Sequence, residues 1–442
     1  MQDLTDWLNV IGGWVWGPAL LVLLVGTGVF YTVRLKGLQF RALPRALRLA
    51  FSASPQSDAP GDISQFQALM TAMAATIGTG NIAGVATAVV LGGPGAILWM
   101  WLSALFGMST KYAEAYLAVY FRVRDRNGQM AGGPMYYLDK GLGLKSLAIM
   151  FAVCGMLAAL GTGSSVQSNS VAQAVQNTFG IPGWTTGIVL TVVTGLVLLG
   201  GIRSIARVAA VIVPAMAVLY LAGGMIIIGI HYDLVLPALS IIVHDAWAAD
   251  AVAGGAIGAV IRYGVARGVF SNEAGIGTAP IAAAAAKTNH PQDQALVSMT
   301  GTFLDTIVVC TVTGIVLVMA GQFQDGITGA ALTSNSFEAL LPGVGGWVVT
   351  VGLIFFAYST ILGWSYYGEK CAAYLFTEKA VVPYRFIYTA FVMLGTAISL
   401  DLVWALADVF NGLMAFPNLI GLLLLSGIVV HQKMPKPINV HE

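Results

Sequence analysis

Charged residues are scarce in this chain. Of its 442 residues, 21 are lysine or arginine and 20 are aspartate or glutamate, so that 9% are charged while 57% are hydrophobic. A soluble globular protein has about 25% charged residues, and so little polar surface does not cover a protein of this size in water. This excludes soluble enzymes and disordered regulators. The net charge of only +1 gives no field to attract nucleic acid, so we expect none as a partner.

Cysteine and histidine are also rare. The three cysteines (Cys154, Cys310 and Cys371) lie in or beside apolar segments and lack the spacing of a metal cluster or a disulfide framework. The five histidines fall outside the apolar segments. The sequence contains no pattern typical of a catalytic triad or a phosphate-binding loop, so we expect no catalytic residues, no organic cofactor and no enzyme.

Long apolar segments are what the sequence has in abundance. A helix needs about 20 apolar residues to cross a hydrocarbon core about 30 Å thick, and in lipid a helix satisfies its own backbone groups. We therefore predict an all-α polytopic protein with about eleven transmembrane helices in the lipid bilayer. The predicted spans are 14–33, 63–91, 95–121, 145–175, 184–202, 207–230, 251–286, 293–321, 344–376, 383–400 and 404–430. The first residues (1–13) lack the basic start of a signal peptide, so we expect the first span to be retained.

Basic residues predict the orientation of these spans. The loops after the first, third, fifth, seventh and ninth spans carry lysine or arginine, whereas the loops 174–183, 231–250 and 322–343 carry neither. Because positively charged loops stay in the cytoplasm, we expect the N-terminus outside and the C-terminus in the cytoplasm of a cell (inner) membrane.

Two spans contain residues that break a helix. The second has three glycines beside polar side chains in 74–84, and the seventh has a glycine-rich polar stretch in 268–280. Each glycine inside a helix costs about 1 kcal/mol relative to alanine. Irregular backbone at membrane depth is tolerated only where it lines a cavity or is buried in protein. Close helix packing through small residues such as Gly80 and Gly84 is the alternative explanation.

The two breaks occupy corresponding places in two halves of opposite direction. Paired interrupted helices in inverted repeats mark the binding site of a secondary transporter. We therefore expect helices 2–6 and 7–11 to form an inverted 5+5 repeat in which helices 2 and 7 are broken. The expected division is 1–62 for an extra first helix and a basic cytoplasmic loop, 63–230 for the first repeat, 251–430 for the second repeat and 431–442 for a cytoplasmic tail.

Three sequence blocks resemble a known family. The block from Gly92 to Met108, which continues to Lys111 and Glu114, is similar to the signature of the sodium:alanine (alanine or glycine:cation) symporter family, and so are the blocks 75–84 and 271–277. Leu98 stands where the family usually has phenylalanine, which is a conservative apolar change. The resemblance covers nearly the whole chain. It implies the leucine-transporter fold and cotransport of a small neutral amino acid, mainly alanine or glycine, with sodium.

The breaks and their neighbours supply candidates for binding the amino acid. Freed backbone N–H groups at Thr79 and Gly80 are expected to bind its carboxylate. Gln167 is expected to hydrogen-bond its polar groups, with an interhelical hydrogen bond as the alternative. Phe270 and Trp364 are expected to limit the pocket to alanine or glycine size, with ordinary packing as the alternative. The expected substrate-binding residues are Gly78, Thr79, Gly80, Asn81, Gln167, Phe270, Ser271, Asn272, Gly275 and Trp364.

The resemblance also implies two sodium sites. The implied residues are the Thr76 carbonyl and Asn81, with Asp305 as a candidate neighbour, at the first site, and the Ala74 and Ile77 carbonyls with Ser359 and Thr360 at the second. Mostly neutral oxygen ligands suit a monovalent cation better than a tightly held divalent one. For the two hydroxyls of the ninth span, hydrogen bonds back to their own helix are the alternative.

Glu273 is the most unusual charge in the sequence, because an acid near the middle of a span costs about 2.5–3.5 kcal/mol. It is expected either to anchor the unwound segment through backbone amides or to receive a coupling cation or proton. An ion pair with Arg262 or Arg267 is the structural alternative. Lys111 and Glu114, three residues apart, are expected to form a pair on the helix surface from which the lysine snorkels to the interface.

The predicted function is import of alanine or glycine with Na⁺ by alternating access. An ion channel would need a continuous ring of polar residues around a pore, and a membrane enzyme would need a cluster of catalytic side chains. Proton-coupled symport through Glu273 stays open as the closest alternative.

Overall fold

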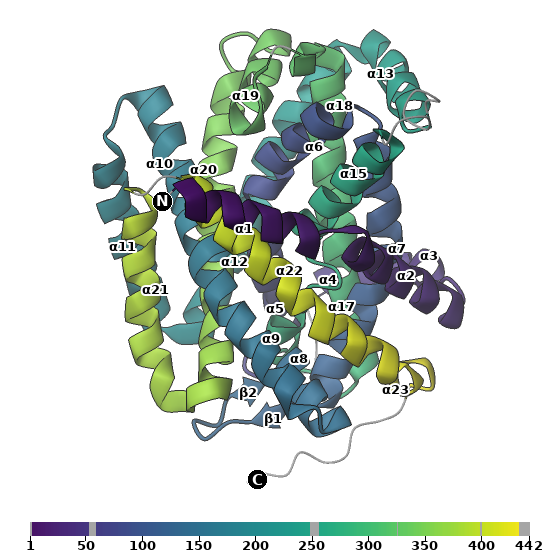
Figure 1. Ribbon diagram of the computed structural model, residues 1–442, viewed down its shortest axis with the longest axis vertical. Coiled ribbons are helices and arrows are strands. Elements are labelled where there is room, and N and C mark those ends of the chain that lie inside the picture. Colours follow the sequence, from purple (N-terminus) through teal and green to yellow (C-terminus); the bar gives the residue numbers. More distant parts are fainter. Residues whose placement is uncertain (1, 53–58, 248–255, 325, 398–399, 433–442) are drawn as a thin grey trace.

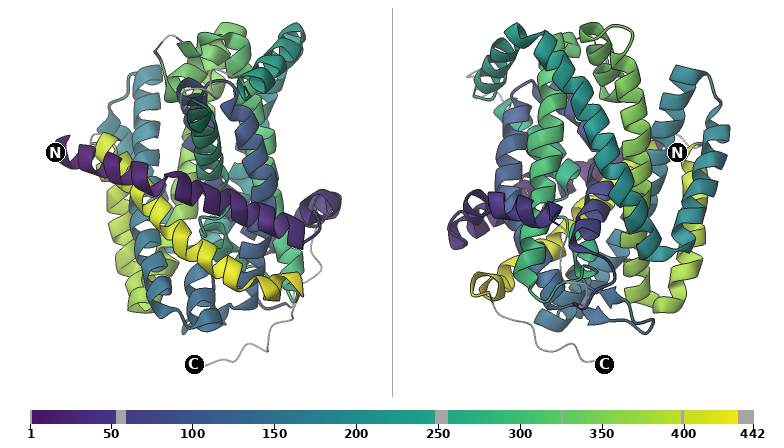
Figure 2. Two further views of the ribbon diagram at one scale, coloured as in Figure 1. Left: turned by 45° about the vertical axis from the view of Figure 1, so that its right-hand side comes forward. Right: turned by 180° about the vertical axis from the view of Figure 1, so that it is seen from behind.

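The computed structural model describes residues 2–52, 59–247, 256–324, 326–397 and 400–432. This part of the chain is a bundle of helices, and most of the long helices run along the longest axis of the molecule (Figure 1). Three helices cross the bundle obliquely on one side (Figures 1 and 2), namely α1 (Gln2–Val15), α2 (Pro18–Arg34) and α22 (Leu400–Leu424). The predicted start of the seventh span (251–255) and most of the predicted tail (433–442) lie outside the described residues.

The predicted spans correspond to helices with similar bounds, except that the first begins at Gln2 and not at residue 14. The first is α1 with α2 and the last is α22; those between are α5 (Gln65–Thr76) with η1 (Gly80–Gly84) and α6 (Val85–Gly92), α7 (Ala96–Tyr120), α9 (Lys145–Ala158) with η3 (Ala159–Ser165) and α10 (Val166–Phe179), α11 (Gly183–Leu199), α12 (Gly201–Ile230), α15 (Ala256–Asn272) with α16 (Ala279–Ala284), α17 (Pro291–Thr302) with η4 (Phe303–Cys310) and α18 (Thr311–Ala320), α20 (Gly345–Phe376), and α21 (Val381–Gly395).

Shorter elements connect these spans. They are α3 (Leu38–Arg41), α4 (Leu43–Phe51), α8 (Pro134–Tyr136), η2 (Tyr137–Gly141), α13 (Tyr232–Asp245), η5 (Gln322–Gln324), α19 (Gly329–Leu340), η6 (Glu378–Ala380), α23 (Ser426–Val430), and the strands β1 (Val123–Arg124) and β2 (Met130–Ala131). The two strands pair antiparallel, with Val123 opposite Ala131. They lie at the end of the bundle opposite α13 and α19 (Figure 1). We call these two ends the hairpin end and the α19 end.

The outside of the bundle is apolar, as a lipid-facing surface requires. Large apolar side chains such as Trp14, Leu199 and Val211 are exposed on it. Within the described residues, six helical segments are long and apolar enough to cross a membrane, and the bent pair Gln65–Thr76 and Gly80–Gly92 makes a seventh. The prediction of an all-α, multi-pass membrane protein is confirmed.

Two local features differ from the sequence-based expectation. The hairpin of β1 and β2 adds a short sheet, which no alternation of apolar residues announced because each strand has only two residues. The predicted basic loop between the fifth and sixth spans is absent as a loop. Only Gly200 separates α11 from α12, and Gly201 begins α12 with φ +59, a conformation that favours glycine. The chain therefore turns at once, and Arg203 lies in the first turn of α12.

The predicted break in the second span is visible as a sharp bend. α5 and the helix Gly80–Gly92 are inclined by 53°. α5 begins with a capping box in which Ser64 and Gln67 exchange side-chain and backbone hydrogen bonds. π-helical turns (η1, η3 and η4) interrupt the second, fourth and eighth spans near mid-bundle. Such turns free backbone groups and are frequent at functional sites.

The two broken helices are joined at the hairpin end. The N–H groups of Asp62 and Ile63 donate to the carbonyl of Ala285 at 2.8 and 3.2 Å, and the N–H of Lys287 donates to the carbonyl of Ile63 at 2.8 Å. We call this backbone connection between residues 60–63 and 284–288 the strap. It ties the start of α5 to the end of α16.

A buried arginine completes the strap. Arg122, just after α7, donates to the carbonyls of Ala284 at 3.1 Å, Ala286 at 2.7 Å and Thr288 at 2.8 Å, and to that of Pro60 at 3.0 Å. Burial lowers the pKa of Arg122 to about 10, so the guanidinium is still charged at neutral pH. One charged side chain therefore joins three segments that are far apart in the sequence.

Candidate functional site

The break in the second span exposes backbone groups around Gly78. α5 ends at Thr76, and the next residue, Ile77, has extended backbone (φ −76, ψ 95). The N–H of Gly78 donates to Oδ1 of Asn81 at 2.9 Å, and the N–H of Thr79 approaches Oε1 of Gln167 at 3.5 Å. Side chains, not the helix, therefore satisfy these amides, and a bound ligand has backbone donors and acceptors within reach.

The break in the seventh span is longer. Residues 273–278 between α15 and α16, which we call the link, contain three positive φ angles, at Glu273 (+56), Gly275 (+89) and Gly277 (+96). Glycine adopts these conformations without strain, whereas Glu273 does not. Oε2 of Glu273 accepts a hydrogen bond from the hydroxyl of Thr278 at 2.5 Å. The predicted unwound stretch in 268–280 is confirmed.

A single buried carboxylate joins both breaks. Asp305, in η4, accepts a hydrogen bond from Nδ2 of Asn81 at 2.7 Å on Oδ1, and from the Ser271 hydroxyl at 2.8 Å on Oδ2. The hydroxyl of Thr306 also donates to Oδ2 at 2.8 Å, and Asn272 Nδ2 donates to that hydroxyl at 3.0 Å. The second, seventh and eighth spans thus meet at this acid, which lies beside Asn81, one of the implied ligands of the first sodium site.

A second group of oxygens lies between α5 and α20. The hydroxyl of Thr360 lies 3.1 Å from the carbonyl of Ala74 and 3.3 Å from that of Ile77, and the hydroxyl of Ser359 lies 3.3 Å from the Ala74 carbonyl. Both hydroxyls also lie within hydrogen-bond distance of the Phe356 carbonyl of their own helix. The four implied ligands of the second sodium site are therefore neighbours, and the back-bonding alternative holds at the same time. We call these four oxygens the α5–α20 oxygen group.

Close backbone contact makes this arrangement possible. A Cβ at Gly363 would lie 2.7 Å from the backbone nitrogen of Ala75, so α20 approaches α5 at a glycine. A Cβ at Gly78 would lie 2.5 Å from the hydroxyl oxygen of Thr360. The absence of side chains at these two glycines is what lets the oxygen group form.

The other expected substrate-binding residues lie at different places. Gln167 donates to the hydroxyl of Thr79 at 3.3 Å and to the carbonyl of Thr162 at 3.1 Å, so it lies at the first break. A Cβ at Gly80 would lie 3.6 Å from the ring of Phe270. Trp364 packs against the backbone of Gly163 in η3, where a side chain would overlap it.

Gly275 lies apart from this group, on the side of the link that faces α7. Its N–H donates to Oε1 of Glu114 at 3.0 Å, and its carbonyl accepts from Asn418 at 2.8 Å. Asn418 also donates to Oε1 of Glu114 at 2.7 Å. The backbone of this residue is therefore already paired with side chains of α7 and α22.

One charge prediction from the sequence is wrong, and one alternative that it left open is not borne out. Lys111 and Glu114 are 3% and 0% exposed, so they do not form a snorkelling surface pair. Hydropathy does not predict the burial of these two residues. Glu114 is buried because it accepts the N–H of Gly275 in the link, a contact that only the fold creates. In the described residues no ion pair joins Glu273 to Arg262 or Arg267, and Glu273 is paired with Thr278 instead.

A cavity of about 710 Å³ leads from the α19 end to the breaks. We call it the vestibule. Its lining comes from η1, α6, α10, α15, α19, α20 and α22, and includes Gly80, Gln173, Arg267, Phe270, Trp404 and Asp408. Trp404 stacks near Phe270 with ring centroids 5.8 Å apart. Sequence analysis missed Trp404 and Asp408, since nothing in the last span marks them and only the fold brings them to Phe270.

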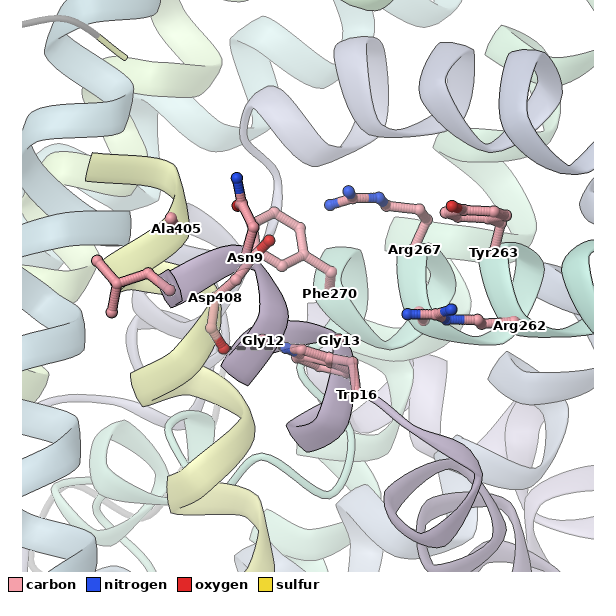
Figure 3. A pocket seen from close by; sticks show the side chains of 12 residues that line it. Asn9, Gly12, Gly13, Trp16, Arg262, Tyr263, Arg267, Phe270, Ala405 and Asp408 are labelled. Carbon is pink, nitrogen blue, oxygen red and sulfur yellow. Dashed lines mark hydrogen bonds between the residues drawn. The ribbon is translucent and has the colours of Figure 1, made fainter. Parts of the chain in front are cut away.

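A smaller cavity of about 160 Å³ adjoins the vestibule and shares Arg267, Phe270 and Asp408 with it. It lies between α1, α15 and α22, and Figure 3 shows the side chains around it. Here the indole N–H of Trp16 donates to the backbone carbonyl of Asp408 at 2.9 Å. The extra first helix therefore packs against the rim of the vestibule.

Comparison with known proteins gives a consistent result over the whole chain. The profile of the sodium:alanine symporter family matches residues 1–434. The sodium/alanine symporter AgcS of Methanococcus maripaludis is 57% identical over 439 residues, which cover 98% of this chain and 97% of that protein. The probable sodium/glutamine symporter GlnT of Bacillus subtilis is 39% identical, with 97% and 90% covered.

Solved structures share the fold. The crystal structure of MhsT in complex with L-phenylalanine has a TM-score of 0.58 at 12% identity and covers 84% of this chain and 98% of MhsT. The crystal structure of a mutant of the Eremococcus coleocola manganese transporter has a TM-score of 0.55 at 15% identity, with 86% and 85% covered. At such identities the likeness concerns the fold alone, and it confirms the expected leucine-transporter fold.

Proposed function

The chain belongs to the sodium:alanine symporter family, and we propose that it imports a small neutral amino acid, alanine or glycine, together with Na⁺. It is a transporter and not an enzyme. The observation that carries the proposal is the α5–α20 oxygen group, in which Ser359 and Thr360 lie 3.1–3.3 Å from the freed carbonyls of the broken helix. Sodium is the coupling ion in this proposal, and no organic cofactor takes part.

The proposed sodium sites use the two sets of oxygens at the breaks. A cation between α5 and α20 would take lone pairs from the two hydroxyls and from the carbonyls of Ala74 and Ile77. The hydroxyl protons would then turn to the Phe356 carbonyl, which already lies 2.9 and 3.0 Å away. At the other site the Thr76 carbonyl and Asn81 would hold the ion, with the Asp305 carboxylate compensating its charge.

The proposed amino-acid site lies beside them. Backbone N–H groups of residues 78–80 would bind the carboxylate, and Gln167 would add its amide. Phe270, with Trp404 beside it, lies next to Gly80 in the lining of the vestibule and would limit the pocket to a short side chain. Ser271, Asn272 and Trp364 remain proposed contacts of the substrate. Gly275 would act through the shape of the link, because its amide is paired with Glu114.

We propose alternating access as the mechanism, with 63–230 and 251–430 as the two repeats and 1–62 as an added helix and loop. The vestibule reaches the breaks from the α19 end, while the strap ties the broken helices at the hairpin end. If the hairpin end faces the cytoplasm, as the basic loops predict, this arrangement is open to the outside and the N-terminus is external. Import of one Na⁺ then gains about 2.3 kcal/mol per 100 mV of membrane potential.

A proton-coupled symporter is the second candidate. The observation that favours it is Glu273, a buried acid in the link that has no ion-pair partner in the described part of the chain. A proton on this carboxyl would replace a coupling sodium. The two mechanisms differ in the gradient that drives uptake.

The test is counterflow uptake of labelled alanine and glycine into proteoliposomes that contain the purified protein. Uptake is measured in Na⁺, in K⁺, and in K⁺ with an imposed pH gradient. We expect uptake in Na⁺ alone. Uptake driven by the pH gradient without Na⁺ would establish the proton-coupled alternative, and transport of neither amino acid would contradict the substrate assignment.

A further inference from the structure

A lysine is buried behind the link with no visible partner. Lys111 lies in α7 and is 3% exposed, and its Nζ has no hydrogen-bond partner among the described residues. An ammonium group in such a place is costly unless charges of opposite sign surround it. The sodium and substrate sites described above give this lysine no role.

The register of α7 places Lys111 against the link. One turn before it, a Cβ at Gly107 would lie 2.9 Å from Cβ of Ala274, and one turn after it Glu114 accepts the N–H of Gly275 at 3.0 Å. Residues three and four apart share a helix face. The lysine therefore lies on the face of α7 that follows the link from Ala274 to Gly275.

Three acids lie close enough to Lys111 for their charges to act on it, namely Glu114 of the same helix, Glu273 of the link and Asp305 of η4. Oε1 of Glu114 accepts hydrogen bonds from the link and from Asn418, and the whole carboxylate is buried. An ammonium without a hydrogen-bond partner in the described residues and a buried carboxylate thus lie three residues apart on one helix face.

We propose that Lys111 is a tethered counter-ion. It lowers the affinity of the Asp305 site for sodium and offsets the negative charge of the acids around the link when the ion leaves. It touches neither ion nor substrate, so it is a positioning residue that acts through Asp305. Its positive charge repels an incoming cation in a medium where water does not screen it. The same ammonium group remains beside the acids around the link when the site holds no sodium.

The proposal rests on sodium coupling, and its test compares the sodium dependence of uptake in full-length protein in proteoliposomes. Lys111→Gln removes one positive charge, so we expect the sodium KM to fall by about three- to tenfold, which corresponds to about 0.7–1.4 kcal/mol of lost repulsion, while the maximal rate falls. A merely structural role would lower the rate without tightening sodium binding.

Glu114→Gln is the matched variant of opposite sign. It keeps an Oε1 that accepts from Gly275 and Asn418, and it removes one negative charge, so the sodium KM should rise. The double variant Lys111→Gln/Glu114→Gln restores the local charge and should return the sodium KM to within about twofold of the parent. If Lys111→Gln does not fold, Glu114→Gln alone carries the test.

The outcomes separate the two proposals. A parent protein whose uptake does not respond to Na⁺ contradicts the proposed function. A parent that responds, together with a sodium KM that is unchanged or higher in folded Lys111→Gln, or unchanged in Glu114→Gln, overturns the counter-ion role alone.

Discussion

At the first break, the absence of a side chain at Gly78 matters as much as the polar groups around it. Gly78 lies where a Cβ would come within 2.5 Å of the Thr360 hydroxyl and 3.5 Å of Oε1 of Gln167. The glycine pattern predicted a break here, and the polar residue Asn81 beside it was a natural candidate. Lys111 was misplaced because hydropathy alone does not reveal that two acids from distant segments, Glu273 and Asp305, come near it.

The variant Gly78→Ala should impair binding of sodium and amino acid together. The added methyl group overlaps the Thr360 hydroxyl, and relieving such a clash in a packed interior costs about 1–3 kcal/mol. We expect the KM for both ligands to rise by about tenfold, which corresponds to about 1.4 kcal/mol. Gly84→Ala is the control, because a Cβ there meets nothing within 4 Å although it belongs to the same broken span. Equal uptake kinetics in the two variants would contradict the assignment.

Thr360→Val tests the sodium site more directly. Valine keeps the shape of threonine and removes the hydroxyl that lies 3.1 Å from the Ala74 carbonyl. The loss of one such oxygen is worth about 1 kcal/mol, so the sodium KM should rise by roughly fivefold, with a smaller change in the amino-acid KM. Thr389→Val removes a hydroxyl that donates to the Arg385 carbonyl of its own helix α21 at 2.7 Å, and it should leave sodium dependence unchanged. A sodium KM that is the same in both variants would rule out a Thr360 ligand.

At the scale of elements, the breaks were the most predictable features. Clustered glycines and polar residues in two apolar segments indicated unwinding, and the positive φ angles of Gly275 and Gly277 give the physical reason in the second case. The hairpin and the strap were not predictable. The hairpin has too few residues for a pattern, and the strap depends on backbone groups, which carry no sequence signal.

The strap gives a prediction at this scale. Arg122→Gln removes a charged donor from four carbonyls, and hydrogen bonds from a charged group contribute about 1.5–3 kcal/mol each, without adding up fully. The amides of Asp62, Ile63 and Lys287 should then exchange hydrogen for deuterium faster, because their bonds cross the strap. Arg124→Gln, at an exposed position two residues on, is the control. Unchanged exchange in Arg122→Gln would show that the backbone bonds hold the strap without the arginine.

For the whole molecule, the sequence did not predict that one end of the bundle is open and the other is closed. The basic loops predicted which end faces the cytoplasm, but not which end is open. The vestibule is lined by segments that include α10, α19 and α22, and only their packing brings Trp404 and Asp408 to its rim. Such contacts between distant segments have no local pattern in one sequence.

Thiol labelling tests this openness. The native cysteines are buried, so the parent protein should react little with a membrane-impermeant maleimide. Gln173→Cys, which lines the vestibule, should be labelled in intact cells, and Na⁺ with alanine should slow its labelling as the vestibule closes. Arg124→Cys at the hairpin end should react only after permeabilisation. Labelling of Arg124→Cys in intact cells would reverse the orientation, and labelling of Gln173→Cys that ligands do not change would contradict closure.

The buried arginine also sets an order for biogenesis. Arg122 leaves the ribosome long before the carbonyls of Ala284, Ala286 and Thr288, which are three of its four partners. Until that later part of the chain is synthesised and inserted, the guanidinium has only the Pro60 carbonyl and water for partners. The first half of the protein therefore cannot complete its own structure, and a chain that stops before residue 288 should be recognised and degraded by membrane proteases.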